Sequence, residues 1–272
     1  MATVATGGAG ATIRLTVINP NTTESMTRLI EACARQVAGP GTEVTGRTPA
    51  MGPASIESHY DEALAVPGLL QVIREDRGAD VFVIACFGDP GLDAAREVAR
   101  VPVVGIAEAA MKTASLLGRT FSVVTTLGRT MGRAWDLTRT YGLERQCAGV
   151  HACEIPVLDL EEDKDRTYAA ILDRAKAALA EDHSDAIVLG CAGMAGLPEL
   201  LASQLGVPVV DGVAAATVMA EGLARLGLRP SDQGELASPP PKAYTGMLAP
   251  FGVASGLDGT IMDWSARALN EH

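Results

Sequence analysis

The sequence predicts an α/β protein with two pseudo-symmetric lobes, each a parallel β-sheet flanked by helices, and an active site in the cleft between them. Two observations lead to this fold class. Short apolar runs typical of buried parallel strands alternate with helical stretches along most of the chain. The second half also repeats the spacing of the first, since Cys191 follows Cys86 by 105 positions, as Gly193 follows Gly88.

The first half contains four expected strands, and helical patterns separate them. The strands span residues 12–18, 43–46, 80–86 and 102–106, and the two long helices span about 22–37 and 57–77. The third strand, "DVFVIAC", is apolar throughout, as expected for a parallel strand covered on both faces. Asp89 and Pro90 follow it and predict the start of a short helix, because Asp caps helices well and Pro favours the first helical position.

The second half shows the same alternation. Strands are expected at 120–126, 150–155, 186–191 and 208–212, with helices at about 130–141, at 163–181 and after residue 191. The run "VPVV" at 101–104 recurs at 207–210. We therefore expect a flexible leader at 1–11, a first lobe of 12–117 plus about 209–230, a second lobe of 118–208, and a C-terminal extension at 231–272. Prolines 239–241 predict an extended backbone there, ahead of a short terminal helix near 261–269.

Composition excludes several classes of partner. The net charge of −11 and the aromatic content of 4% argue against nucleic acids and anionic membrane surfaces as partners. No apolar run reaches the roughly 18–20 residues that span a bilayer. The first residues lack the charged and apolar regions of a secretion signal, and five cysteines in so long a chain do not suggest a disulfide framework. These features predict a cytoplasmic protein with reduced thiols.

Ligands of parallel α/β sheets bind at the carboxyl ends of the strands, and four such loops carry polar or unusual residues. In the first loop Asn21 is expected to cap the next helix, with Glu24 completing a capping box. Asn19 precedes a proline and is expected to keep its amide free for a ligand. Thr125 and Thr126 end another strand and offer hydroxyl groups.

The two remaining loops, "CFGDPG" and "GCAGMAG", each place a cysteine at a strand end. A single cysteine in such a place is usually a small packing residue, but two at repeat-equivalent positions beside glycines favour chemistry. The backbone N–H groups around Phe87 and Gly88, and around Ala192 and Gly193, are expected to bind an oxyanion and favour thiolate.

The other polar side chains give no comparable signal. Cys33, Cys147 and Cys153 are interpreted as packing residues. The four histidines have no metal-ligand spacing, so no metal site is expected, and no Walker loop, nucleophile elbow or dinucleotide fingerprint occurs. The sequence therefore shows no sign of a metal, phosphate-loop or dinucleotide site.

The segments "INPNT", "PASIES", "IACFGDPGLDAARE", "VVTTLGRT", "IVLGCAGM" and "VPVVDG" together resemble the aspartate/glutamate racemase superfamily, in its hydantoin/allantoin racemase branch. The resemblance covers about residues 13–228. It implies two pseudo-symmetric lobes, racemisation without a cofactor by two cysteines that correspond to Cys86 and Cys191, and a homo-oligomer. It also adds Ser55 and Ile56 to the candidate substrate-binding residues.

Within that branch, "CFGDPG", "GIAEAAM" and "SIESHYDEA" resemble allantoin racemases more closely. Hydantoin racemases commonly have a second acid where Gly88 stands, and a glycine there is expected to leave room and remove a charge near the ring substituent. The resemblance thus implies inversion at carbon 5 of allantoin between the two thiols. A helix N-terminus beside each thiol is expected to poise its pKa near neutral. Asn19, Thr125 and Thr126 would bind the imide and ureido groups.

Other functions stay open on the sequence alone. The chain could racemise 5-substituted hydantoins or an amino acid, or bind a metabolite in the same cleft without catalysis. The intact cysteine pair disfavours the superfamily's single-cysteine decarboxylases, and the branch motifs disfavour maleate isomerases. A thiol redox protein is disfavoured because no C-x-x-C motif occurs.

Overall fold

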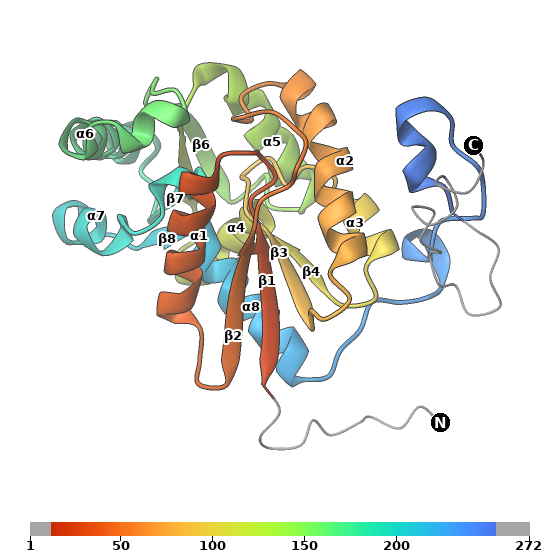
Figure 1. The fold of residues 1–272 in the computed structure, drawn as a ribbon. Coiled ribbons are helices and arrows are strands. Elements are labelled where there is room, and N and C mark those ends of the chain that lie inside the picture. Colours follow the sequence, from red (N-terminus) through yellow and green to blue (C-terminus); the bar gives the residue numbers. More distant parts are fainter. Residues whose placement is uncertain (1–11, 254–272) are drawn as a thin grey trace.

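A computed structural model describes residues 12–253 and contains two four-stranded parallel β-sheets. The first sheet has the strand order β2-β1-β3-β4 and the second has the order β6-β5-β7-β8, so both follow the same topology (Figure 1). The strands of the first sheet are β1 (Ile13–Ile18), β2 (Thr42–Arg47), β3 (Val81–Ile84) and β4 (Val103–Gly105). Those of the second sheet are β5 (Phe121–Thr125), β6 (Cys147–Ala152), β7 (Ala186–Gly190) and β8 (Val209–Asp211). The α/β class with two similar lobes is confirmed.

Helices cover both faces of each sheet. Those that follow strands of the first sheet are α1 (Glu24–Val37), α2 (His59–Glu75), α3 (Leu92–Val98) and α4 (Ile106–Leu117). Those that follow strands of the second are α5 (Met131–Thr140), α6 (Lys164–Asp182), α7 (Pro198–Leu205) and α8 (Gly212–Arg225). The first sheet packs between α2 and α3 on one face and α1, α4 and α8 on the other. The second sheet packs between α4 and α5 on one face and α6 and α7 on the other.

Helix α4 belongs to the cores of both lobes. Its residues Ile106 and Ala109 pack with the first sheet, whereas Ala110 and Met111 pack with the second. Helix α8 crosses over in the same way, because it follows β8 of the second sheet but packs on the first. The sequence placed residues 209–230 wholly in the first lobe. The structure differs for β8, which belongs to the second sheet. It pairs in parallel with β7, with Val210 opposite Val188.

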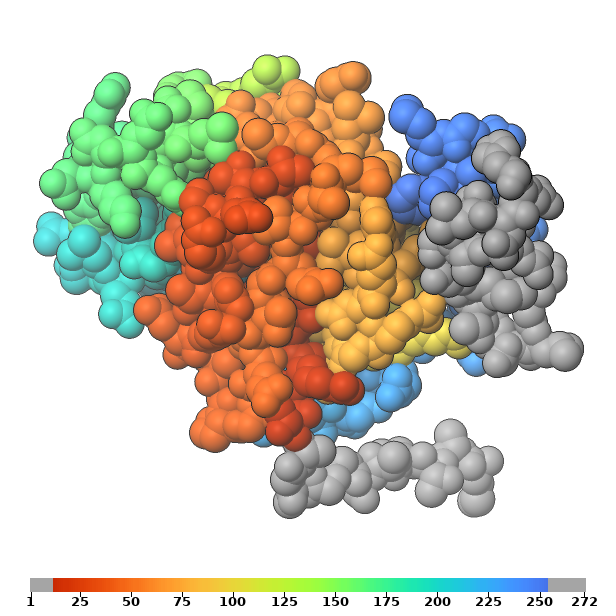
Figure 2. Space-filling view, viewed as in Figure 1, coloured from red at the N-terminus to blue at the C-terminus, as the bar shows by residue number. Residues whose placement is uncertain are grey.

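The segment after α8 leaves the two lobes and returns along one side of the molecule. It contains the short 3₁₀ turns Gly234–Leu236 and Gly246–Phe251 and is otherwise extended, as the prolines predicted. Arg74 of α2 donates to the carbonyl of Pro250 at 2.8 Å and lies over the ring of Phe251. Figures 1 and 2 show this segment beside α2 and α3. The expected leader and terminal helix lie outside the described residues.

Two further observations bear on the function classes considered above. No helix between residues 12 and 253 is long and apolar enough to cross a bilayer. In the same range, no three His, Cys, Asp or Glu side chains gather where they could hold a metal ion.

Candidate active site

A cavity opens where the carboxyl ends of the two sheets meet. It encloses about 590 Å³, including the open space at its mouth. The first lobe lines it with Asn21, Met26, Ile56, Glu62, Ala85, Cys86, Phe87 and Gly88. The second lobe lines it with Thr125, Thr126, Thr130, Arg133, Ala134, Val157, Gly190, Cys191 and Ala192. Ligands of parallel sheets generally bind at the carboxyl ends of the strands, and the cavity lies there.

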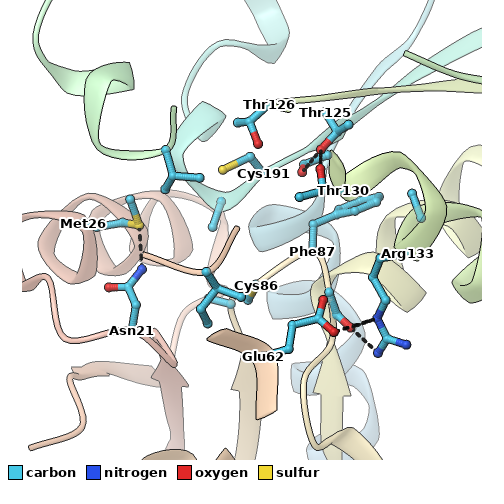
Figure 3. A pocket seen from close by; sticks show the side chains of 17 residues that line it. Asn21, Met26, Glu62, Cys86, Phe87, Thr125, Thr126, Thr130, Arg133 and Cys191 are labelled. Atoms are coloured by element: carbon cyan, nitrogen blue, oxygen red, sulfur yellow. Dashed lines mark hydrogen bonds and ion pairs between the residues drawn. The ribbon is translucent and has the colours of Figure 1, made fainter. Parts of the chain in front are cut away.

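Two cysteines face this cavity, one from each lobe. Cys86 lies just beyond β3 and Cys191 just beyond β7, which are third in the strand order of their sheets. Figure 3 shows the two side chains on opposite sides of the cavity. A ligand held between them would therefore have one thiol on each face.

Each cysteine also receives a hydrogen bond to its sulfur from the glycine two residues later. The Gly193 N–H donates to Sγ of Cys191 at 3.4 Å, and the Gly88 N–H takes the equivalent role at Cys86. These N–H groups lower the thiol pKa, but burial has the larger effect. Burial raises the pKa of Cys86 to about 12 and that of Cys191 to about 11.

Both cysteines are thus thiols at neutral pH in the ligand-free protein. The sequence led us to expect thiol pKa values near neutral, and the structure does not show them. Burial is the main reason, and the helix geometry does not offset it. The expected helix after Cys86 begins only at Leu92, and Cys191 precedes a single 3₁₀ turn, Ala192–Met194. Neither sulfur therefore lies at the start of a long helix dipole.

Most of the predicted substrate-binding residues reach the cavity. Ile56, Phe87, Gly88, Thr125, Thr126 and Ala192 all line it. The hydroxyl of Thr125 is already engaged, because it donates to the Gly190 carbonyl at 3.1 Å. The hydroxyl of Thr126 has no hydrogen bond within residues 12–253 and is the better placed of the two for a ligand.

Asn19, Ser55 and Gly193 are not among the lining residues. Asn19 is 1% exposed, and its amide donates to Asn21 Oδ1 at 2.8 Å and to Thr27 Oγ1 at 3.0 Å. It therefore holds the loop together instead of binding a ligand. Gly193 directs its N–H at the sulfur of Cys191, so this group is not free for an oxyanion.

The amide side chain that does line the cavity is that of Asn21, which the sequence suggested only as a helix cap. Helix α1 begins at Glu24 with Thr23 at its N-cap position, so the capping box is not formed. Asn21 Oδ1 instead accepts from the Thr23 N–H at 2.9 Å, and its Nδ2 donates to the sulfur of Met26 at 3.2 Å. Its presence one residue before "TTE" gave no hint of a role in the cavity.

Glu62 of α2 and Arg133 of α5 were also missed by the sequence reasoning. Arg133 Nε lies 3.4 Å from Glu62 Oε2, and the same guanidinium donates to the Gly88 carbonyl at 3.0 and 2.6 Å (Figure 3). A Cβ atom at position 88 would lie 2.5 Å from Glu62 Oε1. The glycine therefore does leave room, but the Glu62 carboxylate fills it, so the charge near this point is not removed.

Comparison with known proteins places the chain in a family. A model described as "Asp/Glu/Hydantoin racemase" matches residues 15–220. The hydantoin racemase of Pseudomonas sp. (strain NS671) is 45% identical over 88% of this chain and 97% of its own length. The hydantoin racemase of Rhizobium meliloti is 49% identical over 85% and 96%.

Solved structures agree. The allantoin racemase from Klebsiella pneumoniae has a TM-score of 0.85 and 50% identity, covering 88% of this chain and 98% of its own. The allantoin racemase from Pseudomonas fluorescens has a TM-score of 0.84 and 44% identity, covering 86% and 100%. A glutamate racemase from Francisella tularensis, 17% identical with a TM-score of 0.56, shares the fold. The chain therefore belongs to the Asp/Glu/hydantoin racemase family and is an isomerase of the racemase type.

Proposed function

We propose that this racemase inverts carbon 5 of allantoin by proton transfer between Cys86 and Cys191. The observation that carries the proposal is the approach of the two thiols to one cavity from opposite lobes. Inversion requires a base on one face of the carbon and an acid on the other, because a single base tends to return the proton to the face it left.

In this scheme one cysteine is thiolate and takes the hydrogen of carbon 5 as a proton. The electron pair of the broken C–H bond moves into the neighbouring carbonyl to give an enolate. The opposite thiol then delivers its own proton to the other face of carbon 5. The two cysteines finish with their protonation states exchanged, ready for the other enantiomer, so that no cofactor is consumed.

The surroundings support such a transfer. The cavity wall is largely apolar, so charge–dipole interactions inside it are stronger than in water. The hydroxyl of Thr126 and the second hydrogen on Nδ2 of Asn21 are neutral polar groups that can bind the ring. Each thiol keeps a glycine N–H that stabilises its charged form when it acts as the base.

A second candidate function is racemisation of hydantoins with other substituents at carbon 5. The two relatives named hydantoin racemase, 45% and 49% identical, support it as strongly as the two allantoin racemase structures support allantoin. Rates on enantiopure allantoin and on 5-alkylhydantoins, measured by polarimetry without added cofactor, decide between them. Binding without any loss of optical rotation would contradict both functions.

Replacing either active-site thiol tests the mechanism. We expect Cys86→Ser and Cys191→Ser each to lower the racemisation rate by about 10³-fold or more, because an alcohol is a far weaker acid than a thiol. Cys147→Ser is the matched control, since Cys147 is a buried thiol in the core of the second lobe. It should fold and retain its activity.

Hydrogen exchange separates the two steps. In D₂O a single-cysteine variant should exchange the carbon-5 hydrogen of one enantiomer without inverting it, as its remaining thiolate still removes and returns a proton. Full racemisation by both serine variants would refute the two-base scheme.

We also propose a homo-oligomer, which the resemblance suggests, and a cytoplasmic location, which the cysteine content and the lack of a secretion signal suggest. Light scattering of the purified protein tests the first, and fractionation of the source cells tests the second.

A further inference from the structure

The two charged residues at the cavity, Glu62 and Arg133, have no part in the proton transfer proposed above. Among the described residues that line the cavity, they are the two that carry a full charge. They come from opposite lobes and lie at one end of the cavity, while Asn21 and Met26 lie at the other (Figure 3). Charged side chains are costly to bring to an apolar wall, so their presence here needs a reason.

The contacts of the pair leave one acceptor and one donor available. The ion pairs of Glu62 within residues 12–253 both involve Oε2, at 3.4 Å from Arg133 and 3.9 Å from His59. Oε1 instead rests against Gly88, where only a glycine gives it space. The hydrogen bonds of Arg133 in the same range involve Nε and Nη2, so Nη1 remains without one.

We infer that Glu62 and Arg133 form the subsite for the substituent on carbon 5 and select one that offers both N–H groups and a carbonyl, as a ureido group does. This inference rests on the proposed function. Glu62 Oε1 accepts from the N–H groups of the substituent, and Arg133 Nη1 donates to its carbonyl. Hydrogen bonds to charged groups are the stronger ones, so the pair favours a ureido group over an alkyl group.

The charge of Glu62 indicates that it serves the substituent and not the ring. Removing the hydrogen of carbon 5 places negative charge on the ring oxygen, and a carboxylate beside that oxygen would oppose the reaction. Inversion moves only the hydrogen from one face to the other and leaves the substituent near the same place. One subsite therefore serves both enantiomers.

The pair is also held firmly enough to discriminate. Arg133 is fixed by two hydrogen bonds to the Gly88 carbonyl, two residues after Cys86, so the subsite is tied to the loop that carries one of the thiols. An alkyl substituent would leave the half-buried carboxylate without a partner for Oε1. A site that hydrogen-bonds its substrate discriminates against analogues that lack the partner groups.

The test compares allantoin with 5-methylhydantoin, which has the same ring but no ureido group. We expect Glu62→Gln to lower kcat/KM for allantoin by on the order of 10- to 100-fold and to leave kcat/KM for 5-methylhydantoin within about threefold. Arg133→Lys also loses the paired hydrogen bonds to the Gly88 carbonyl, so it should lower kcat/KM for both substrates, and by more for allantoin. Glu75→Gln, on the same helix but away from the cavity, is the matched control and should change neither. Unchanged thermal unfolding of all three variants checks that the fold is intact.

The outcomes separate the inference from the proposed function. An equal fall on both substrates, or no fall on either, would overturn the subsite assignment and leave the racemase intact. A wild-type protein that racemises 5-methylhydantoin but not allantoin would also overturn the assignment, while hydantoin racemisation would stand. A wild-type protein that racemises neither substrate would overturn both.

Discussion

At the scale of single residues, the chemistry depends on two partly buried thiols that line one cavity. Burial opposes ionisation of Cys86 and Cys191, and one glycine N–H for each sulfur offsets only part of that cost. The ligand-free enzyme therefore holds little thiolate near neutral pH.

This has a direct consequence for the pH dependence of racemisation. The pKa values of about 12 for Cys86 and about 11 for Cys191 belong to the ligand-free enzyme, and kcat/KM reports the ionisation of that form. Since the thiolate is the active base, kcat/KM should rise from pH 7 to about pH 9.5 without a plateau. The rate of alkylation by iodoacetamide, followed by mass spectrometry, should rise in parallel at both cysteines. A plateau with its midpoint near pH 7 would contradict this.

Site residues differ in how well the sequence alone could reveal them. The cysteines were identifiable because each ends an apolar strand and the two share one spacing. Glu62 was not, because it is one of several acids in a helix, and nothing in "SHYDEA" marks which carboxylate turns inward. Asn19 and Asn21 are both polar residues after β1, and only the tertiary contacts decide which of them lines the cavity.

At the scale of elements, helix α4 has an N-cap from a distant part of the chain. Gly105 precedes the helix and has no side chain to cap it, whereas Asp211 at the equivalent place caps α8 through the N–H groups of Val213 and Ala214. Asp89 supplies the missing cap. Its two carboxylate oxygens accept from the N–H groups of Ala107 and Glu108 at 3.1 and 2.9 Å.

The sequence predicted Asp89 to cap the helix that immediately follows it, and the structure shows why that was wrong. Asp89 has a φ of 42°, and the chain turns once more before α3 begins beyond Gly91. Its side chain consequently points across to α4. The hydroxyl of Tyr141, at the end of α5, also donates to the Asp89 carboxylate at 2.6 Å. A Cβ at position 105 would lie 2.4 Å from the Asp89 carboxylate, so the glycine and the distant cap depend on each other.

Asp89→Asn tests this cap. Asn tolerates the positive φ, so the backbone conformation is kept. Its NH₂ group, however, replaces an oxygen that accepts a hydrogen bond in the wild type, so two donors then face each other. We expect a loss of about 1–3 kcal/mol in the free energy of unfolding, measured by urea denaturation. Asp93→Asn in the exposed first turn of α3 is the control and should change stability by less than about 0.5 kcal/mol. Equal stability of both variants would show that the second carboxylate oxygen contributes nothing to the cap.

At the scale of the whole molecule, the two lobes meet along α4 and α8, and we expect this contact to set the spacing of the two thiols. Both helices follow the last strand of a sheet, and the 106-residue repeat places Gly212 on Ile106. These equivalent residues touch each other across the lobe interface, as expected near a pseudo-twofold axis. The repeat in the sequence therefore predicted two lobes. It did not predict that β8 joins the second sheet while α8 packs on the first, because the direction of the chain after β8 depends on tertiary packing.

Cross-lobe contacts over the cavity add to this arrangement. The Glu57 carboxylate, in the loop before α2, accepts from the Val157 N–H of the second lobe at 2.7 Å. Arg133 reaches from α5 to the Gly88 carbonyl of the first lobe. Hydrogen bonds thus join the two lobes at two places beside the cavity, and we expect the shape of the cavity to depend on how one lobe sits on the other.

Adding one methyl group at the helix contact tests whether lobe spacing controls activity. In Gly212→Ala the new Cβ would lie 2.8 Å from the Ile106 carbonyl oxygen, so the start of α8 must move away from α4. We expect a loss of about 1–3 kcal/mol in the free energy of unfolding and a fall in kcat/KM of at least about tenfold, because small displacements of reacting groups are costly. Gly222→Ala, on the same helix with open space around it, should match or slightly exceed the wild-type stability. Racemisation at the wild-type rate by a destabilised Gly212→Ala would show that the site tolerates movement of the lobes.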